Sequence, residues 1–344
     1  DLRAGSLDNR DGLVEAREGL ALNVDTLLGN QQGKLLGANT SVTSQSLDNS
    51  DGLIQGDTSL TLSQSADVLN VNGQLLAGQD LTLTAASLDN HGGGRLNGQT
   101  RLTLDLLGGL LDNRDGWITT PGALLLNRLG RVDNRAGEIS SQQAFVLAAT
   151  ALDNGSGKLL SEQGLTLRIA QWLDNSKGLV SAPRLDVRAG SLVNLSGSLN
   201  SAGAIALVVD EAFDNQSGKL LADSAVLRVG SLDNRLGLLQ GDTTFDLGSL
   251  GAVDNRHGTL FAGQQFDVSA ASLDQRDGGR LSSQSGVTLD LNGGALNNQG
   301  GLINAPGQLL FRNLGSVANL GGEISSATSF ELAANRLDNG GKLL

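Results

Sequence analysis

Few residues in this 344-residue sequence could perform acid–base or nucleophilic chemistry. There are two histidines, His91 and His257, and no cysteine. The histidines are out of phase with each other in the repeat described below, and neither keeps a fixed partner. A serine nucleophile needs a histidine base that a third group orients, so no such triad can be assembled. We interpret both histidines as solvent-exposed turn residues, and we predict no catalytic residue.

Paired carboxylates could cleave a polysaccharide, a reaction that parallel β-helices can host. Such a site should interrupt the repeat with an insertion carrying unique acidic and aromatic residues, yet no insertion exceeds about three residues. Trp117 and Trp172 could stack on a sugar ring, but nearly three repeats separate them. Packing at the edge of the core or on a strand face is the simpler interpretation. The sequence therefore predicts a protein that is not an enzyme.

The most regular polar feature is an asparagine that ends the triplet Leu-Asp-Asn or a close variant. It returns every 19 to 21 residues, apart from two steps of 23 residues. Identical amides in neighbouring repeats can hydrogen-bond to one another and form a ladder. We predict a structural ladder made of Asn9, Asn30, Asn49, Asn70, Asn90, Asn113, Asn134, Asn154, Asn175, Asn194, Asn215, Asn234, Asn255, Asn298, Asn319 and Asn339, with Gln275 in the place of one further asparagine.

Other residue types keep phase with this asparagine, and they indicate the elements that position it. A glycine follows three residues later, an aliphatic residue five residues later, and then a small residue and an apolar pair with period two. Period two is the signal of a strand, and no stretch sustains a helical period. Such a unit buries its apolar face only by stacking on its neighbours. We predict an all-β parallel β-helix of 16 to 17 coils, about 20 residues and three short strands each.

The corner of each coil follows from the triplet itself. Leucine should face the core, asparagine should lie at the inner edge, and aspartate should point into solvent. Asparagine tolerates left-handed backbone angles, and the glycine permits a tight corner. Arginine often follows the asparagine and should relieve repulsion between stacked aspartates. Calcium is the alternative partner of the aspartates, but the nonapeptide of calcium-binding β-rolls and the EF-hand loop are both absent.

Composition excludes several classes of partner. The net charge is −12, whereas nucleic-acid binding requires a basic face. The absence of cysteine removes thiolate metal sites. We therefore predict no nucleic-acid partner, no metal and no cofactor.

A second repeat, 185 residues long, contains nine coils. Asp1–Leu7 returns as Asp186–Leu192, and Glu138–Ser141 returns as Glu323–Ser326. We interpret residues 1–344 as one continuous β-helix segment in which residues 1–159 match residues 186–344. Copying a block lengthens such a segment without creating new chemistry, which favours a spacer.

The pattern Leu-Asp-Asn-x-x-Gly-x-[Leu/Ile]-x-[Ser/Ala], repeated over the whole chain, resembles the haemagglutinin repeats of filamentous-haemagglutinin-type proteins. These are exoproteins of Gram-negative two-partner secretion, and they include adhesins and contact-dependent growth inhibition toxins. The resemblance implies a right-handed β-helix, export through an outer-membrane transporter, and a secreted or cell-surface location. It implies a stalk that projects a distal adhesive or toxic module. The alternative is an adhesin whose own surface binds host receptors or glycans.

Overall fold

The computed structural model describes residues 1–344 and divides into two compact units, Asp1–Ala170 and Gln171–Leu344. Both consist of strands and turns, and no helix is present that could cross a membrane. The strands that begin in the first unit are β1 (Leu2–Ala4), β2 (Leu7–Asp8), β3 (Leu13–Val24), β4 (Leu27–Gly29), β5 (Lys34–Ser44), β6 (Ser46–Asp48), β7 (Leu53–Gln64), β8 (Asp67–Leu69), β9 (Gln74–Ala77), β10 (Asp80–Thr84), β11 (Ser87–Asp89), β12 (Arg95–Gly98), β13 (Arg101–Asp105), β14 (Leu111–Asp112), β15 (Trp117–Thr120), β16 (Ala123–Asn127), β17 (Arg131–Asp133), β18 (Glu138–Ser141), β19 (Phe145–Ala149), β20 (Ala151–Asp153), β21 (Lys158–Ser161) and β22 (Leu165–Asp174).

The remaining strands belong to the second unit. They are β23 (Leu179–Ser181), β24 (Leu185–Val193), β25 (Ser198–Asn200), β26 (Ala204–Asp214), β27 (Lys219–Ala222), β28 (Ser224–Asp233), β29 (Leu238–Gly241), β30 (Phe245–Ser249), β31 (Ala252–Asp254), β32 (Thr259–Ala262), β33 (Phe266–Ser269), β34 (Ser272–Asp274), β35 (Arg280–Ser283), β36 (Val287–Asp290), β37 (Ala295–Asn297), β38 (Leu302–Ala305), β39 (Leu309–Ala318), β40 (Glu323–Ser326), β41 (Phe330–Asp338) and β42 (Lys342–Leu343).

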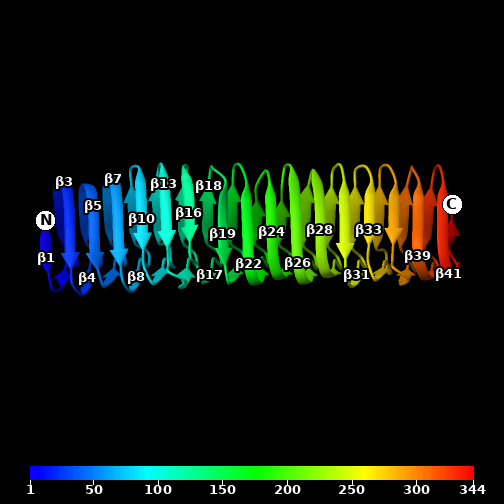
Figure 1. Cartoon of the computed structure of the whole chain (residues 1–344), viewed down its shortest axis with the longest axis horizontal. Helices are drawn as coiled ribbons and strands as arrows, with labels where there is room; N and C mark the ends of the chain where they lie inside the picture. Colours follow the sequence, from blue (N-terminus) through cyan, green and yellow to red (C-terminus); the bar gives the residue numbers. More distant parts are fainter. The chain divides into compact units, whose positions relative to one another are not determined.

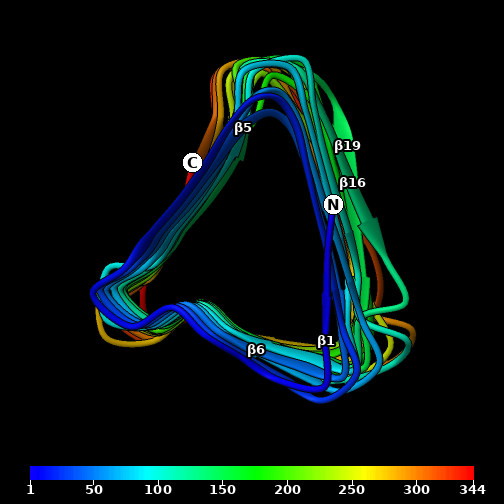
Figure 2. The same ribbon diagram turned by 90° about the vertical axis from the view of Figure 1, so that its left-hand side faces the viewer.

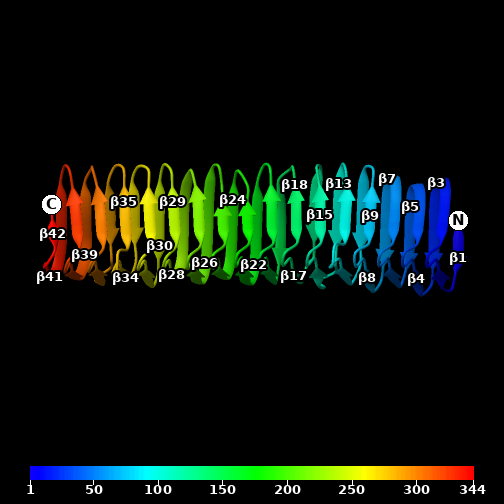
Figure 3. The ribbon, with the colours of Figure 1, turned by 180° about the vertical axis from the view of Figure 1, so that it is seen from behind.

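Each unit is a β-solenoid, and the chain makes about 16 coils of about 21 residues. Strands of successive coils lie side by side and pair in parallel (Figures 1 and 3). In Figure 2 a coil has three sides, and the chain runs clockwise as it recedes from the N-terminus, so the coil is right-handed. The predicted all-β parallel β-helix is confirmed.

The first side of each coil carries the in-phase aliphatic residue. In the first unit Leu75 pairs with Leu96, Leu96 with Ile118, and Ile118 with Ile139, all fully buried. Leu96 comes six residues after its asparagine instead of five, and the register shows that the extra residue is absorbed in the preceding turn. The aliphatic stack therefore continues through an insertion.

The second side carries the apolar pair, and the third side ends in the leucine, aspartate and asparagine of the triplet. In the second unit the rings of Phe245 and Phe266, which pair in register, stack with centroids 4.7 Å apart and planes 8° apart. Buried and half-buried residues alternate along β10 and β30, as period two requires. The core inside each coil is narrow and is filled mainly by stacks of aliphatic side chains, so it needs few aromatic residues.

Candidate functional site

The asparagine corner is the chemical feature that recurs through both units. In the first unit each asparagine from Asn9 to Asn134 donates from Nδ2 to Oδ1 of the next asparagine, at 2.7–2.8 Å. In the second unit the same bond runs from Asn175 to Asn255 at 2.6–2.7 Å and from Asn298 to Asn339 at 2.9 Å. The amides inside these runs are fully buried. The residues predicted for the ladder thus lie one above another within each unit.

The side-chain amide of each asparagine also hydrogen-bonds to the backbone of the corner. Asn113 Nδ2, for example, lies 3.2 Å from the carbonyl oxygen of Gly116 in its own coil and 3.3 Å from that of Glu138 in the next coil. A primary amide has two donors and one acceptor oxygen, so one side chain serves the ladder and the backbone together. Each asparagine therefore fixes both the shape of its coil and the stacking of the next.

The column is interrupted at Gln275. Asn255 Nδ2 donates to Gln275 Oε1 at 2.5 Å, but Gln275 Nε2 and Asn298 Oδ1 have no hydrogen-bond partner. Both residues are fully buried. Glutamine is one methylene longer than asparagine, so its amide cannot occupy the same place in the column. Two buried polar atoms are left unsatisfied, which costs free energy.

The backbone of the corner differs from our expectation. In an ordinary coil neither the asparagine nor the glycine three residues later has the left-handed backbone angle. The residue directly before the glycine has it, with φ of 56° at Asp115 and 55° at Ala136. The glycine is required for space: a Cβ on Gly137 would lie 2.0 Å from the carbonyl oxygen of Asn113. Asparagine tolerates left-handed backbone angles, but no asparagine of the column adopts one.

In two coils the crowded glycine comes one residue later. Gly92 and Gly93 have φ of 66° and 100°, and Gly94 takes the crowded position, with a notional Cβ 2.4 Å from Asn70 O. Gly278 and Gly279 repeat this arrangement, with φ of 81° at Gly278. The extra residue therefore lies in the turn and leaves the asparagine column and the aliphatic stack in register.

The aspartate row has a backbone role that sequence reasoning missed. Asp112 Oδ1 accepts the backbone N–H of Arg114 at 3.1 Å, and the same bond to the residue two positions later forms at Asp48, Asp133, Asp153, Asp174, Asp214, Asp233, Asp254 and Asp274. The Asp112 side chain is only 14% exposed, and Asp133 is buried. The prediction that this row points into solvent is wrong for Asp133, whereas the other aspartates named here are partly exposed. The sequence did contain a signal for this bond, because an aspartate before a turn commonly accepts the backbone N–H two residues later.

Arginine links successive aspartates. Arg114 lies 2.6 Å from Asp112 and 3.9 Å from Asp133 of the next coil, and Arg256 likewise lies between Asp254 and Asp274. Burial raises the pKa of Asp112, but the hydrogen bonds from the guanidinium and backbone N–H of Arg114 outweigh it, so the pKa lies below its ordinary value. The predicted alternation of the two charges is present.

His91 is not a freely exposed turn residue. Its Nδ1 lies 2.5 Å from Asp89 Oδ1, and ligand atoms of Asp89, His91 and Asp112 lie within 4.8 Å of one another. Such a trio could hold a cation, but Arg114 already donates to both carboxylate oxygens of Asp112. His257 occupies the left-handed position of its own corner, with φ of 57°. That no metal is bound stays a prediction.

The two tryptophans lie on strand faces. Trp117 is on β15 and is 39% exposed, with the Arg95 guanidinium 4.8 Å from the ring centre. Trp172 is half-buried on β22. Neither ring enters the core.

Right-handed parallel coils with a buried amide column define a structural repeat protein. The haemagglutinin repeat family matches residues 1–70, 53–136, 95–181, 164–217, 184–250 and 229–344. The chain therefore belongs to the haemagglutinin-repeat family, as the sequence pattern predicted. It is similar to the deoxyribonuclease CdiA of Dickeya dadantii (strain 3937), with 36% identity over 112 residues. The match covers 33% of this chain and 3% of CdiA. No solved structure is significantly similar to the chain.

Proposed function

We propose that this chain is a stalk segment of a secreted, filamentous cell-surface exoprotein of a Gram-negative bacterium, holding a distal adhesive or toxic module away from the cell. The observation that carries the proposal is the recurrence of one corner through both units: a buried amide, a crowded glycine and an aliphatic stack. In such a repeat each coil contacts only its neighbours, so coils can be added without altering those already present. That property suits a spacer.

The proposal also covers how the full protein is exported and where any toxic activity lies. The relative named CdiA is described as a deoxyribonuclease, and this chain corresponds to a small part of it. We propose that any toxic activity resides outside this segment, which is itself not an enzyme. We also propose that the full protein crosses the outer membrane through a two-partner secretion transporter. A solenoid without cysteine can form after export, because stacking and ladder hydrogen bonds supply its stability.

We propose that duplication of a nine-coil block accounts for the length of the solenoid. The residues with positive φ recur 185 positions apart, including Leu107 with Asn292 and Arg128 with Asn313. Strands β15 and β18 have counterparts at the same offset in β38 and β40. These correspondences support the proposal that residues 186–344 copy residues 1–159 within one continuous solenoid. A spacer gains from copying, whereas a single catalytic site does not.

An in-register deletion in the full-length exoprotein tests the stalk. Removing residues 176–255 joins Asn175 to Arg256 and takes out four coils. At a strand spacing of roughly 4.8 Å the surface filament should shorten by about 19 Å, measured by averaged electron cryotomography. An epitope placed beyond the segment should remain displayed.

Deleting residues 176–245 is the matched control, since it removes about three and a half coils instead of four and sets the amide column out of register. It should abolish display. Loss of display with the in-register deletion, or an unchanged filament length, would contradict the stalk. The alternative, an adhesin whose surface binds a ligand directly, has separate support in a groove on the first unit.

A further inference from the structure

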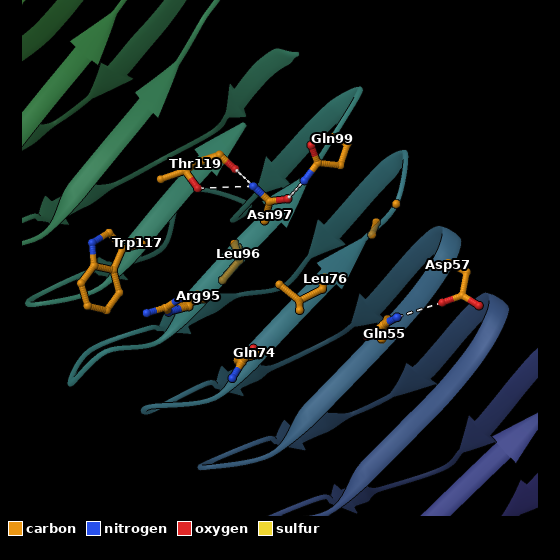
Figure 4. Close-up of a pocket in the computed structure, with 12 residues that line it drawn as sticks. Gln55, Asp57, Gln74, Leu76, Arg95, Leu96, Asn97, Gln99, Trp117 and Thr119 are labelled. Carbon is orange, nitrogen blue, oxygen red and sulfur yellow. Dashed lines mark hydrogen bonds between the residues drawn. The ribbon is translucent and has the colours of Figure 1, made fainter. Parts of the chain in front are cut away.

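A groove of about 720 Å³ runs across the outward face of β7, β9, β12 and β15 in the first unit. Figure 4 shows side chains from these four successive strands lying along it. Because the strands pair in register, the side chains form columns, one of which contains Gln55, Leu76, Asn97 and Thr119. The groove is therefore built by residues from several coils.

Carboxamides dominate the polar lining, and hydrogen bonds hold them in place. Gln55 Nε2 donates to Asp57 Oδ1 at 2.8 Å, and Gln99 Nε2 donates to Asn97 Oδ1 at 2.8 Å. Asn97 Nδ2 in turn donates to the carbonyl oxygen of Thr119 at 2.8 Å. A carboxamide offers donors and an acceptor together, which matches a hydroxyl group that also donates and accepts. A row of such groups suits a ligand with many hydroxyls.

One wall of the groove is aromatic. Trp117 is exposed on the surface, with Arg95 packed over its ring. The glycine turn of the preceding coil supports it: a Cβ on Gly93 would lie 3.7 Å from Trp117 Cζ3. Indole rings beside hydrogen-bonding groups bind ligands that have an apolar face and a polar rim. A pyranose ring has these two features.

The charges narrow the class of ligand. The ionisable groups of the lining are Arg95 and Asp57, which balance each other, whereas the whole chain carries a net charge of −12. A polyanion would be repelled by that field. An extended peptide that adds to a sheet needs a free strand edge, but β9 and β12 are paired on both sides. We propose that this groove binds an uncharged oligosaccharide, with Trp117 stacking on one sugar ring and the carboxamides bonding to hydroxyls of adjacent sugars.

The second unit supplies a natural comparison at positions 185 residues later. Gln240 donates to Asp242 at 2.6 Å, as Gln55 donates to Asp57. However, Leu302 replaces Trp117 and Ser282 replaces Asn97. These residues pair in the same register as their counterparts. Leucine and serine are thus compatible with the fold at these places, while removing the ring and the amide that the proposal invokes.

Binding of the 344-residue chain to an array of neutral and acidic oligosaccharides tests the proposal, followed by titration with the best neutral binder. Isothermal titration calorimetry measures binding for every variant, and Trp117 fluorescence, read in a Trp172→Phe background, reports occupancy wherever Trp117 is present. We expect saturable binding that changes little with salt, because the ligand is uncharged. Trp117→Leu and Asn97→Ser should each weaken binding at least tenfold.

Gln240→Ala in the second unit is the matched control for Gln55→Ala and should leave binding unchanged. Melting temperatures of all variants separate lost binding from lost folding. No binding to any neutral glycan, binding only to acidic glycans with strong salt dependence, or full binding by a folded Trp117→Leu variant would each overturn the proposal. It goes beyond the stalk function, and the deletion of residues 176–255 leaves every groove residue in place.

Discussion

Asn90 and Gln275 occupy equivalent places in two coils that both contain an extra turn residue. Asn90 Nδ2 donates to Asn113 Oδ1 at 2.8 Å and to Gly94 O at 3.0 Å. Gln275 has the same functional group, yet its Nε2 and the Oδ1 of Asn298 are buried without partners. The insertion alone does not break the column, because the Asn90 coil contains it too. The length of the side chain does.

The next coil differs between the two regions as well. After Asn90 it contains Asp112 and Arg114, which form a bidentate pair. At the equivalent places the second unit has Asn297 and Gln299, and Asn297 Oδ1 accepts only the Gln299 backbone N–H at 3.4 Å. Two stabilising features are therefore missing at one coil boundary. We expect the coil boundary between Gln275 and Asn298 to be less stable than the boundary between Asn90 and Asn113. Substitutions can give each boundary the residues of the other.

The largest effect is expected at the crowded glycine. A Cβ on Gly94 would lie 2.4 Å from both Asn70 O and Asn90 Oδ1, so Gly94→Ala should destabilise by roughly 3 kcal/mol, at the upper end for overpacking. At Gly279 the nearest contact, Asn255 O, is 2.5 Å away, and the side-chain oxygen Gln275 Oε1 lies 2.9 Å away. Gly279→Ala should therefore cost less. Chemical denaturation measures both.

Gly19→Ala is the control for these two variants. A Cβ there meets only Asn39 O, at 3.9 Å, and it should change stability little. Equal costs at Gly94 and Gly19 would show that backbone freedom, and not space, requires the glycine.

Replacing the asparagine of the first unit by glutamine should interrupt the amide column there, as Gln275 does in the second unit. Asn90→Gln displaces the amide and leaves Asn113 Oδ1 without its donor. We expect a loss of about 2 kcal/mol, the cost of unsatisfied buried polar groups. Asn127→Gln, at an exposed position on β16, should have no measurable effect. If the two variants unfold at the same denaturant concentration, the column adds nothing to stability.

The reverse exchange should repair the second unit. Gln275→Asn brings an amide of the correct length between Asn255 and Asn298, which should add about 1 kcal/mol by satisfying two buried groups. The midpoint of denaturation should rise with an unchanged denaturant slope. No gain would indicate that a bound water already bridges Gln275 and Asn298 in solution.

The sequence predicts the period, the parallel coils, the inward aliphatic residue and the asparagine column, because each repeats at a fixed offset in one chain. It does not predict contacts that depend on geometry between coils. The clash that requires Gly137 involves the carbonyl of Asn113, in the preceding coil. The groove beside Trp117 likewise combines four strands that the sequence places about 20 residues apart. The partial burial of the aspartates was not predicted, because their charge suggested full exposure, whereas one carboxylate oxygen bonds to the backbone.

The smallest predicted effect concerns pH and the pair that the second unit lacks. The pKa of Asp112 lies below its ordinary value of 3.8, because hydrogen bonds from Arg114 outweigh burial. A carboxylate whose folded-state pKa is depressed contributes stability above its unfolded pKa and loses it as pH falls through the folded value. Asp112→Asn, which copies Asn297, should therefore destabilise by about 0.5 kcal/mol at pH 7, a typical value for one exchanged ion pair. The deficit should shrink as the pH falls below 3.8 and the carboxylate becomes protonated, and Asn297→Gln should show no such pH dependence. A deficit that persists at low pH would show that the charge of Asp112 is not the cause, because asparagine can still accept the turn hydrogen bond, as Asn297 does.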